Sequence, residues 1–191
     1  MQKSQQPHVE LERARSSINA MQASNSLDEF EENWKDFLHR IERVWNKTAN
    51  HYGKSPKWNG WQGKILKLRK DDQLLSYLIN ARGAEEHTVD DVVGRQSGGI
   101  GINPAEGNSL YIEHLSFNGP NIFIKSPQKI KVEFFAARTV LLPIKNRGRV
   151  YPVPKNHLGK QVDSSNVIQI AEIALEFYRK FIEEVEQAFV R

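Results

Sequence analysis

Residues 61–91, WQGKILKLRKDDQLLSYLINARGAEEHTVDD, combine an apolar pattern that builds a core with a dense group of polar side chains. The apolar side chains recur at helical spacing, at Ile65, Leu68, Leu75, Leu78 and Ile79. This spacing predicts one long helix over residues 61–87 that packs against neighbouring helices. The polar group comes late in the same stretch and consists of Asn80, Arg82, Glu85, Glu86 and His87. We therefore expect this helix to carry the functional site.

The composition is that of a globular protein. The chain has 191 residues, of which 39% are hydrophobic and 26% charged, which indicates one domain or one domain with an insertion. No apolar run approaches the length of a membrane span, and no hydrophobic segment follows the N-terminal lysine, so a cytoplasmic location is expected. The absence of cysteine excludes disulfides, thiolate nucleophiles and cysteine-ligated metals.

Three more segments have helical periodicity, over residues 9–23, 26–51 and 164–190. Ser26 and Glu29 fit a capping box at the start of the second segment. Residues 163–166, Asp-Ser-Ser-Asn, offer several caps for the last one. Together with residues 61–87 these segments predict an antiparallel four-helix bundle.

The period shifts toward two between residues 109 and 154, where four or five short β segments are separated by turn signals. Pro143 and Pro152 cannot donate to a ladder, so their strands should be edges or end there. The glycine-rich residues 92–108 lack a phosphate-loop motif and are interpreted as a flexible connector or lid. The predicted fold is α+β: an antiparallel four-helix bundle (residues 1–92 and 158–191) with a small antiparallel β-sheet inserted between the third and fourth helices (residues 93–157).

Basic residues are concentrated between residues 125 and 160, where nine Lys or Arg and one Glu give +8 on a chain of net charge +4. Such a segment favours RNA or another polyanion as a partner, although a solvated strand face is an equally valid reading. The candidate nucleic-acid-binding residues are Lys129, Lys131, Arg138, Lys145, Arg147, Arg149 and Lys155. Trp58 and Trp61 are either stacking platforms for bases or, as we favour, apolar staples at a helix start.

Most catalytic motifs are excluded by inspection. The six histidines have no metal-ligand spacing, so no metal and no other cofactor is expected. There is no nucleophile elbow, and no dinucleotide fingerprint follows a strand. What remains is Arg82 and His87 in the context YLINARGAEEHTV.

An Arg, four residues and a His late in a long helix resemble the RxxxxH motif of the HEPN superfamily, whose members include prokaryotic ribonucleases and toxin components. The resemblance covers the helical part of the chain and implies metal-independent RNA cleavage, in which Arg82 binds the scissile phosphate and His87 assists proton transfer. It further implies a homodimer that pairs two motifs, a toxin or defence role, and an antitoxin-like protein as partner. Gly83 departs from the family pattern, in which a polar residue often follows the Arg.

Helix geometry limits how this motif can act. Side chains five residues apart point about 140° away from each other on a straight helix, so Arg82 and His87 need either a bend at Gly83 or a second chain related by two-fold symmetry. Asn80 lies seven residues before His87, on the same face, and is the third candidate catalytic residue. The alternative is a non-catalytic nucleic-acid-binding or protein-interaction module, in which Arg82 only pairs with Glu85 or Glu86.

Overall fold

The computed structural model describes residues 1–87 and 92–190, apart from the side chains of residues 85–87. Within these residues the fold is α+β, with five helices and a series of two-stranded ladders. It divides into two compact units. Residues 1–95 and 139–191 form the helical unit, and residues 96–138 form a smaller unit that we call the ribbon unit.

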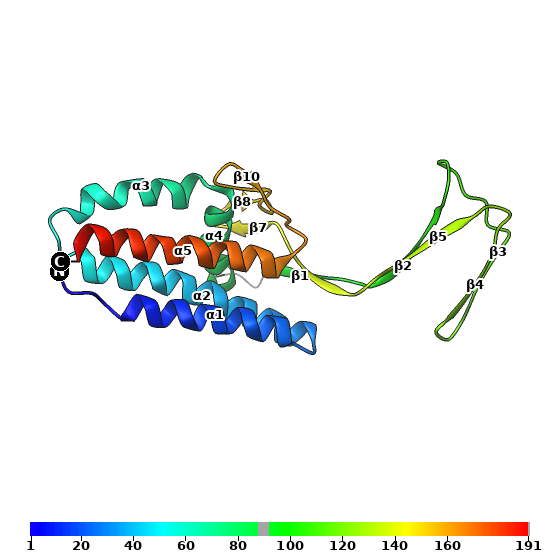
Figure 1. Cartoon of the computed structure of the whole chain (residues 1–191), viewed down its shortest axis with the longest axis horizontal. Coiled ribbons are helices and arrows are strands. Elements are labelled where there is room, and N and C mark those ends of the chain that lie inside the picture. Colours follow the sequence, from blue (N-terminus) through cyan, green and yellow to red (C-terminus); the bar gives the residue numbers. More distant parts are fainter. Residues whose placement is uncertain (88–91, 191) are drawn as a thin grey trace. The chain divides into compact units, whose positions relative to one another are not determined.

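The helical unit contains all five helices: α1 (Gln6–Ala23), α2 (Leu27–Tyr52), α3 (Trp58–Asp71), α4 (Gln73–His87) and α5 (Val167–Phe189). α1 packs against α2 and α5, and these three helices lie side by side along their lengths (Figure 1). The two ends of the chain meet, because the Met1 ammonium donates a hydrogen bond of 2.7 Å to the carbonyl of Phe189. None of the described helices is both long and apolar enough to cross a membrane.

The predicted caps are present. Ser26 accepts a hydrogen bond of 3.1 Å from the backbone N–H of Glu29, and Asn166 accepts one of 3.0 Å from the backbone N–H of Gln169. The apolar stripes behind these caps meet in one core, whose largest fully buried side chains are Trp34, Phe37, Tyr52, Tyr77, Tyr178 and Phe181. The helices of residues 26–51 and 164–190 are thus confirmed to within three residues at each end.

The predicted single helix over residues 61–87 is wrong, because the chain breaks at Asp72 into α3 and α4. Asp72 has an extended backbone (φ −72°, ψ 130°), and its N–H closes α3 on the carbonyl of Leu68. Its side chain opens α4 by accepting a hydrogen bond of 3.0 Å from the N–H of Leu75. The apolar spacing runs across this break, which is why periodicity alone conceals it.

A buried polar network ties α3 to the other helices. Arg69, only 7% exposed, forms an ion pair of 2.8 Å with Glu42 on α2 and donates a hydrogen bond to the hydroxyl of Tyr178 on α5. Its guanidinium carbon lies 4.4 Å from the ring centroid of Trp45. The charge of Arg69 is therefore compensated inside the unit by a carboxylate and a π-face.

The predicted compact sheet of residues 109–154 is also wrong, because the strands form separate two-stranded ladders. In the ribbon unit β2 (Gly99–Pro104) pairs antiparallel with β5 (Ile130–Phe135), and β3 (His114–Asn118) with β4 (Asn121–Lys125). In the helical unit β7 (Ile144–Asn146) pairs with β8 (Arg149–Tyr151), and β9 (Asn156–His157) with β10 (Lys160–Gln161). The ladder of β1 (Val93–Gln96) and β6 (Arg138–Leu141) adjoins the boundary of the two units.

Two details of the β segments follow from these pairings. The supposed connector of residues 92–108 contains β1 and β2, so its glycines are largely strand residues. Strands β6 and β8 end just before Pro143 and Pro152, as the missing proline N–H predicts. Residues 139–157 belong to the helical unit.

Candidate nucleic-acid interface on α4

The β7–β8 hairpin, which we call the basic hairpin (residues 144–151), packs on a polar face of α4. Asn80 of α4 accepts a hydrogen bond of 3.0 Å through Oδ1 from Nδ2 of Asn146, and its own Nδ2 donates one of 2.8 Å to the carbonyl of Ser76. Asn146 is 8% exposed, so this amide pair is nearly closed off from water. Asn80, predicted to be catalytic, therefore uses its side chain to hold the hairpin.

Gly83 lies on the same face of α4, one turn after Asn80. A Cβ atom at residue 83 would come within 2.7 Å of Nδ2 of Asn146, which is closer than real Cβ contacts allow. The Asn146 amide can lie this close to α4 because residue 83 has no side chain. We predicted that Gly83 permits a bend in the motif helix, and close packing is the role that the structure assigns to it.

Arg82 and His87 share α4 with Asn80. Arg82 is half-buried, between Ala81 and Ala84, which have no exposed surface. The side chains of His87, Glu85 and Glu86 lie outside the described residues, so the geometry of the Arg82 and His87 pair stays a prediction.

The basic hairpin turns through two residues with positive φ, Arg147 (49°) and Gly148 (77°), as expected of a tight β-hairpin. The turn and the strands beside it present Lys145, Arg147 and Arg149, all exposed. Within the described part of the chain, no acidic side chain forms an ion pair with any of the three. They are therefore cations available to an anionic ligand.

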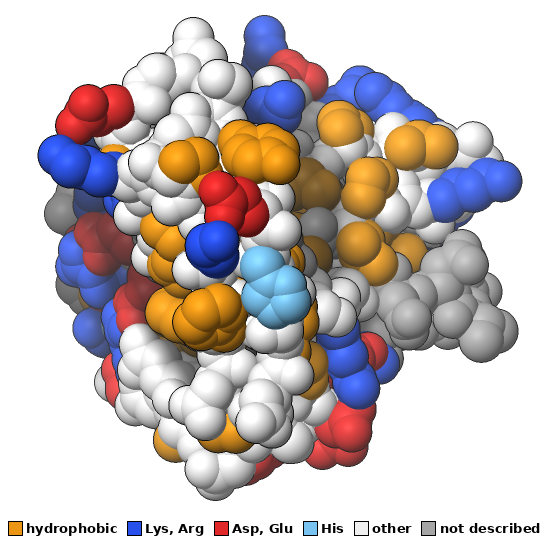
Figure 2. All heavy atoms as spheres, turned by 90° about the vertical axis from the view of Figure 1, so that its right-hand side faces the viewer, with side chains coloured by type: hydrophobic (Ala, Val, Ile, Leu, Met, Phe, Trp, Pro, Cys, Tyr) orange, Lys and Arg blue, Asp and Glu red, His pale blue; other side chains and the backbone are white. Residues whose placement is uncertain are grey.

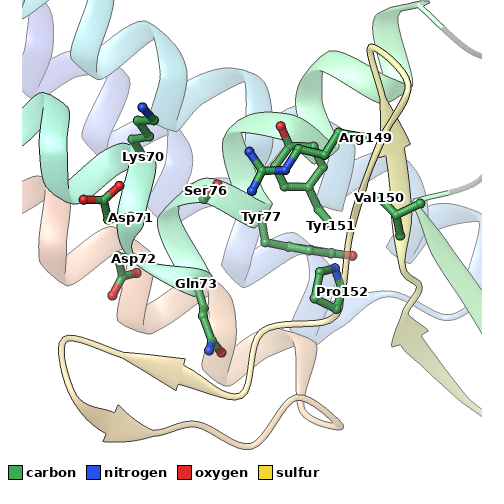
Figure 3. Close-up of a pocket in the computed structure, with 10 residues that line it drawn as sticks. All are labelled: Lys70, Asp71, Asp72, Gln73, Ser76, Tyr77, Arg149, Val150, Tyr151 and Pro152. Carbon is green, nitrogen blue, oxygen red and sulfur yellow. The ribbon is translucent and has the colours of Figure 1, made fainter.

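A small cavity of about 180 Å³ opens between the basic hairpin and the start of α4 (Figure 3). Arg149 and Tyr151 line it from β8, and Gln73 and Ser76 from α4. The guanidinium of Arg149 lies over the Tyr151 ring, 5.4 Å from its centroid, and extends toward Ser76. A cation, an aromatic face and a hydroxyl are groups that bind a phosphate or a nucleotide base.

Acidic groups limit what this cavity can bind. Asp71 and Asp72 also line it, beside Lys70. The Tyr77 hydroxyl is unavailable, since it donates a hydrogen bond of 2.7 Å to the carbonyl of Leu142, and burial raises the pKa of this phenol. The exposed cations of the basic hairpin, more than the cavity floor, are therefore the part suited to a polyanion.

The remaining predicted nucleic-acid ligands are not part of the basic hairpin. Lys155 is exposed in the helical unit, whereas Lys129, Lys131 and Arg138 belong to the ribbon unit. There the lysines pair with acids: Lys125 with Glu113 at 2.7 Å, Lys129 with Glu106 at 3.6 Å and Lys131 with Glu133 at 2.6 Å. Four basic and three acidic residues leave the ribbon unit with a net charge of only +1. Arg138 donates to Gln96 Oε1 at 2.9 Å. The basic segment of residues 125–160 is thus divided between the two units, and its lysines in the ribbon unit are paired with acids.

Two further residues were missed by sequence reasoning. Asp72 Oδ1 accepts a hydrogen bond of 2.9 Å from Nδ1 of His157, and both side chains are nearly buried, at 6% and 11% exposed. Burial raises the pKa of Asp72, but hydrogen bonds from His157, Leu158 and Leu75 lower it more, so the net shift is downward. The signal in the sequence was an Asp directly before Gln73-Leu74-Leu75, which is typical of a helix N-cap.

Among the described residues, no group of three or more His, Asp or Glu side chains could hold a metal ion. Searches for a matching family model, for a similar characterised protein and for a similar solved structure each find no match to this chain. The chemistry of α4 and of the basic hairpin packed on it is therefore what points to a function.

Proposed function

We propose that the protein is a HEPN-like homodimer that binds and cleaves RNA without a metal. The proposal includes the finer fold assignment, an antiparallel four-helix bundle with a β insertion between its third and fourth helices. The observation that carries it is the hydrogen bond between Asn80 and Asn146. It seats three exposed cations, Lys145, Arg147 and Arg149, on the helix that bears Arg82 and His87. Phosphate-binding groups and a candidate acid–base group thus belong to one supersecondary unit.

In the proposed reaction the ribose 2′-hydroxyl attacks the adjacent phosphorus, and the bond from phosphorus to the 5′-oxygen breaks. His87 accepts the proton of the attacking hydroxyl, because an imidazole titrates near neutral pH. Arg82 neutralises charge that develops on the phosphate oxygens. The His87 imidazolium then gives this proton to the departing 5′-oxygen, so the products are a 2′,3′-cyclic phosphate and a 5′-hydroxyl. Since Arg82 and His87 of one straight helix diverge by about 140°, the site takes one residue from each of two chains.

The test is an RNA cleavage assay in EDTA with the full chain and several RNAs of different sequence. Wild-type protein should yield 2′,3′-cyclic phosphate ends, and His87→Ala should abolish them while RNA binding is retained. His114→Ala, at an exposed histidine of the ribbon unit, is the matched control and should cleave normally. Intact RNA with wild-type protein, or unchanged cleavage by His87→Ala, would contradict the proposed reaction.

A second candidate function is a non-catalytic module that binds RNA or an antitoxin-like protein. One observation favours it: both polar atoms of the Asn80 side chain are already engaged within the chain, so this residue is not open to a substrate. The same assay separates the two functions, because the module would bind RNA through the basic hairpin and leave it intact.

A further inference from the structure

The β2–β5 ladder of the ribbon unit has two chemically different faces. Residues directly opposite each other in an antiparallel pair point to the same side. One face is wholly apolar and is formed by the pairs Ile100 with Phe134, Ile102 with Val132 and Pro104 with Ile130. The other carries the ion pair of Lys131 and Glu133, with the ring of Phe135 close over Gly101. The alternation of the two strands therefore segregates apolar from polar side chains.

The β3–β4 ladder repeats this segregation. Its apolar face is formed by the pairs Leu115 with Ile124 and Phe117 with Ile122. Its other face places His114 opposite Lys125 and Ser116 opposite Phe123. Both ladders are thus built like strands that cover a core on one side only.

Much of these apolar faces is exposed in the described chain, although Ile102, Pro104, Ile122, Ile124 and Ile130 are half-buried. Phe134 is 74% exposed and Phe117 64% exposed, and Ile100, Leu115 and Val132 are also open to solvent. Hydrophobic side chains are visible on the surface that Figure 2 shows, between backbone and polar atoms. A two-stranded ribbon is marginally stable in water unless its apolar face packs on something. These faces therefore require a partner.

Charge argues against a polyanion as that partner. The ribbon unit has a net charge of +1, and its lysines already pair with acids on the chain. An anionic membrane surface is disfavoured for the same reason. A protein surface of matching apolar character remains.

Area argues for a second ribbon. Phe117 and Phe134, at roughly 200 Å² per phenylalanine, offer about 270 Å² at their exposures. With the eight aliphatic side chains beside them, five of which are half-buried, the faces offer roughly 600 Å² per copy, which is the lower end for specific interfaces.

We propose that the ribbon unit is a homodimerisation arm, whose apolar faces pack on the same faces of a second copy of this chain. Identical faces meet about a two-fold axis, so each apolar pair finds an apolar pair opposite it, as in a two-layer β-sandwich. The ion pairs of Lys131 with Glu133 and of Lys125 with Glu113 stay on the outside. This inference is independent of RNA cleavage.

Two adjacent phenylalanines give a matched test. Phe134 lies on the apolar face and Phe135 on the polar face of the same strand, at 74% and 57% exposed. Sedimentation equilibrium of the full chain at micromolar concentration should give twice the chain mass of 22.0 kDa. Phe134→Ser should weaken dimerisation roughly ten-fold or more, as at an interface hot spot, and Phe135→Ser by about two-fold or less. Circular dichroism checks that both variants keep their helices.

Cysteine cross-linking tests the same geometry without weakening it. The chain has no cysteine, so Val132→Cys introduces a single thiol on the apolar face and Glu133→Cys one on the polar face. Under oxidation Val132→Cys should form a covalent dimer and Glu133→Cys should not. A monomeric wild-type protein would overturn the proposal, because the faces would then be covered within one chain. Equal cross-linking of the two variants, or a monomer that co-sediments with vesicles, would overturn it as well.

Discussion

Asp72 and His157 are joined by a hydrogen bond of 2.9 Å between Oδ1 and Nδ1, across 85 residues of sequence. The same carboxylate accepts hydrogen bonds from the backbone N–H groups of Leu75, at 3.0 Å, and Leu158, at 2.7 Å. The His157 ring meets Phe177 of α5 edge-on, with centroids 5.9 Å apart. One side chain thus caps α4 and fixes the β9–β10 hairpin, which in turn contacts α5.

Asp72→Asn should destabilise the helical unit in a pH-dependent way. The lowered pKa of Asp72 means that its carboxylate stabilises the fold above the unfolded pKa of about 3.9. That stabilisation is lost as the pH falls through the folded value. At neutral pH the substitution should lower the free energy of unfolding by roughly 1–3 kcal/mol, and the difference should shrink below about pH 4.

Urea denaturation followed by circular dichroism at neutral and acidic pH measures this effect. Asp71→Asn is the control, since Asp71 is exposed and should change stability by less than about 0.5 kcal/mol. A difference between wild type and Asp72→Asn that stays constant from neutral to acid pH would contradict the role given to the carboxylate.

Gly83→Ala should lower stability although alanine is the better helix former. The added Cβ would meet Nδ2 of Asn146 at 2.7 Å, so the Asn146 amide has to shift and its hydrogen bond to Asn80 is disturbed, at a cost of roughly 1–3 kcal/mol. Gly63→Ala on α3 is the matched control, because nothing lies within 4 Å of its Cβ position. That control should gain up to about 1 kcal/mol. If both variants gain stability in urea denaturation, the hairpin does not need the space at residue 83.

Arg69→Lys should be strongly destabilising. Lysine cannot contact Glu42 and Tyr178 together and stack on Trp45, so a buried charge loses part of its compensation. The expected loss is roughly 2–4 kcal/mol, visible as a lower thermal midpoint of the helical signal. Arg179→Lys on α5 is the control. Arg179 also pairs with two glutamates but is 48% exposed, so its loss should stay below about 1 kcal/mol. Equal midpoints for the two variants would refute a structural role for the Arg69 network.

The helices could be predicted where the sequence signals that specify them lie within the helix itself. Capping residues such as Ser26 and apolar spacing within one segment specify α2 and α5 without knowledge of the partner. The break between α3 and α4 was missed because Leu68 and Leu75 keep the helical period across it. The N-cap preference of Asp72 was the competing signal.

The strands were predictable as segments but not as pairs. Alternation identified residues 130–135, yet their partner is β2, in the glycine-rich stretch taken for a connector. Gly101 carries no β propensity and is accommodated there because the Phe135 ring packs over it. A pairing between strands far apart in the sequence, such as β2 with β5, has no signal in the residues around either strand. The hydrogen bond from Asn146 to Asn80, which defines the candidate site, joins residues 66 positions apart and could not be predicted for the same reason.

The basic hairpin should supply the salt-sensitive part of any RNA affinity. Its cations Lys145, Arg147 and Arg149 have no acidic partner among the described residues, whereas the ribbon lysines do. Three cations that each neutralise one phosphate of a single-stranded RNA make the slope of log affinity against log salt steeper by about 2. Replacing the three hairpin cations by Ala should remove this part of the slope and weaken binding at low salt by at least about ten-fold. The control replaces an equal number of charges in the ribbon unit, at Lys125, Lys129 and Lys131.

The control triple should keep most of the affinity, because its three lysines are paired with glutamates and are therefore less available to phosphates than the hairpin cations. Fluorescence anisotropy with a labelled RNA over a salt series measures both slopes on the same preparation. If the two triples weaken binding equally, affinity follows net charge alone and the hairpin has no special role. If only the ribbon triple weakens it, RNA contacts the arm, and the site on α4 has to be abandoned together with the reaction assigned to Arg82 and His87.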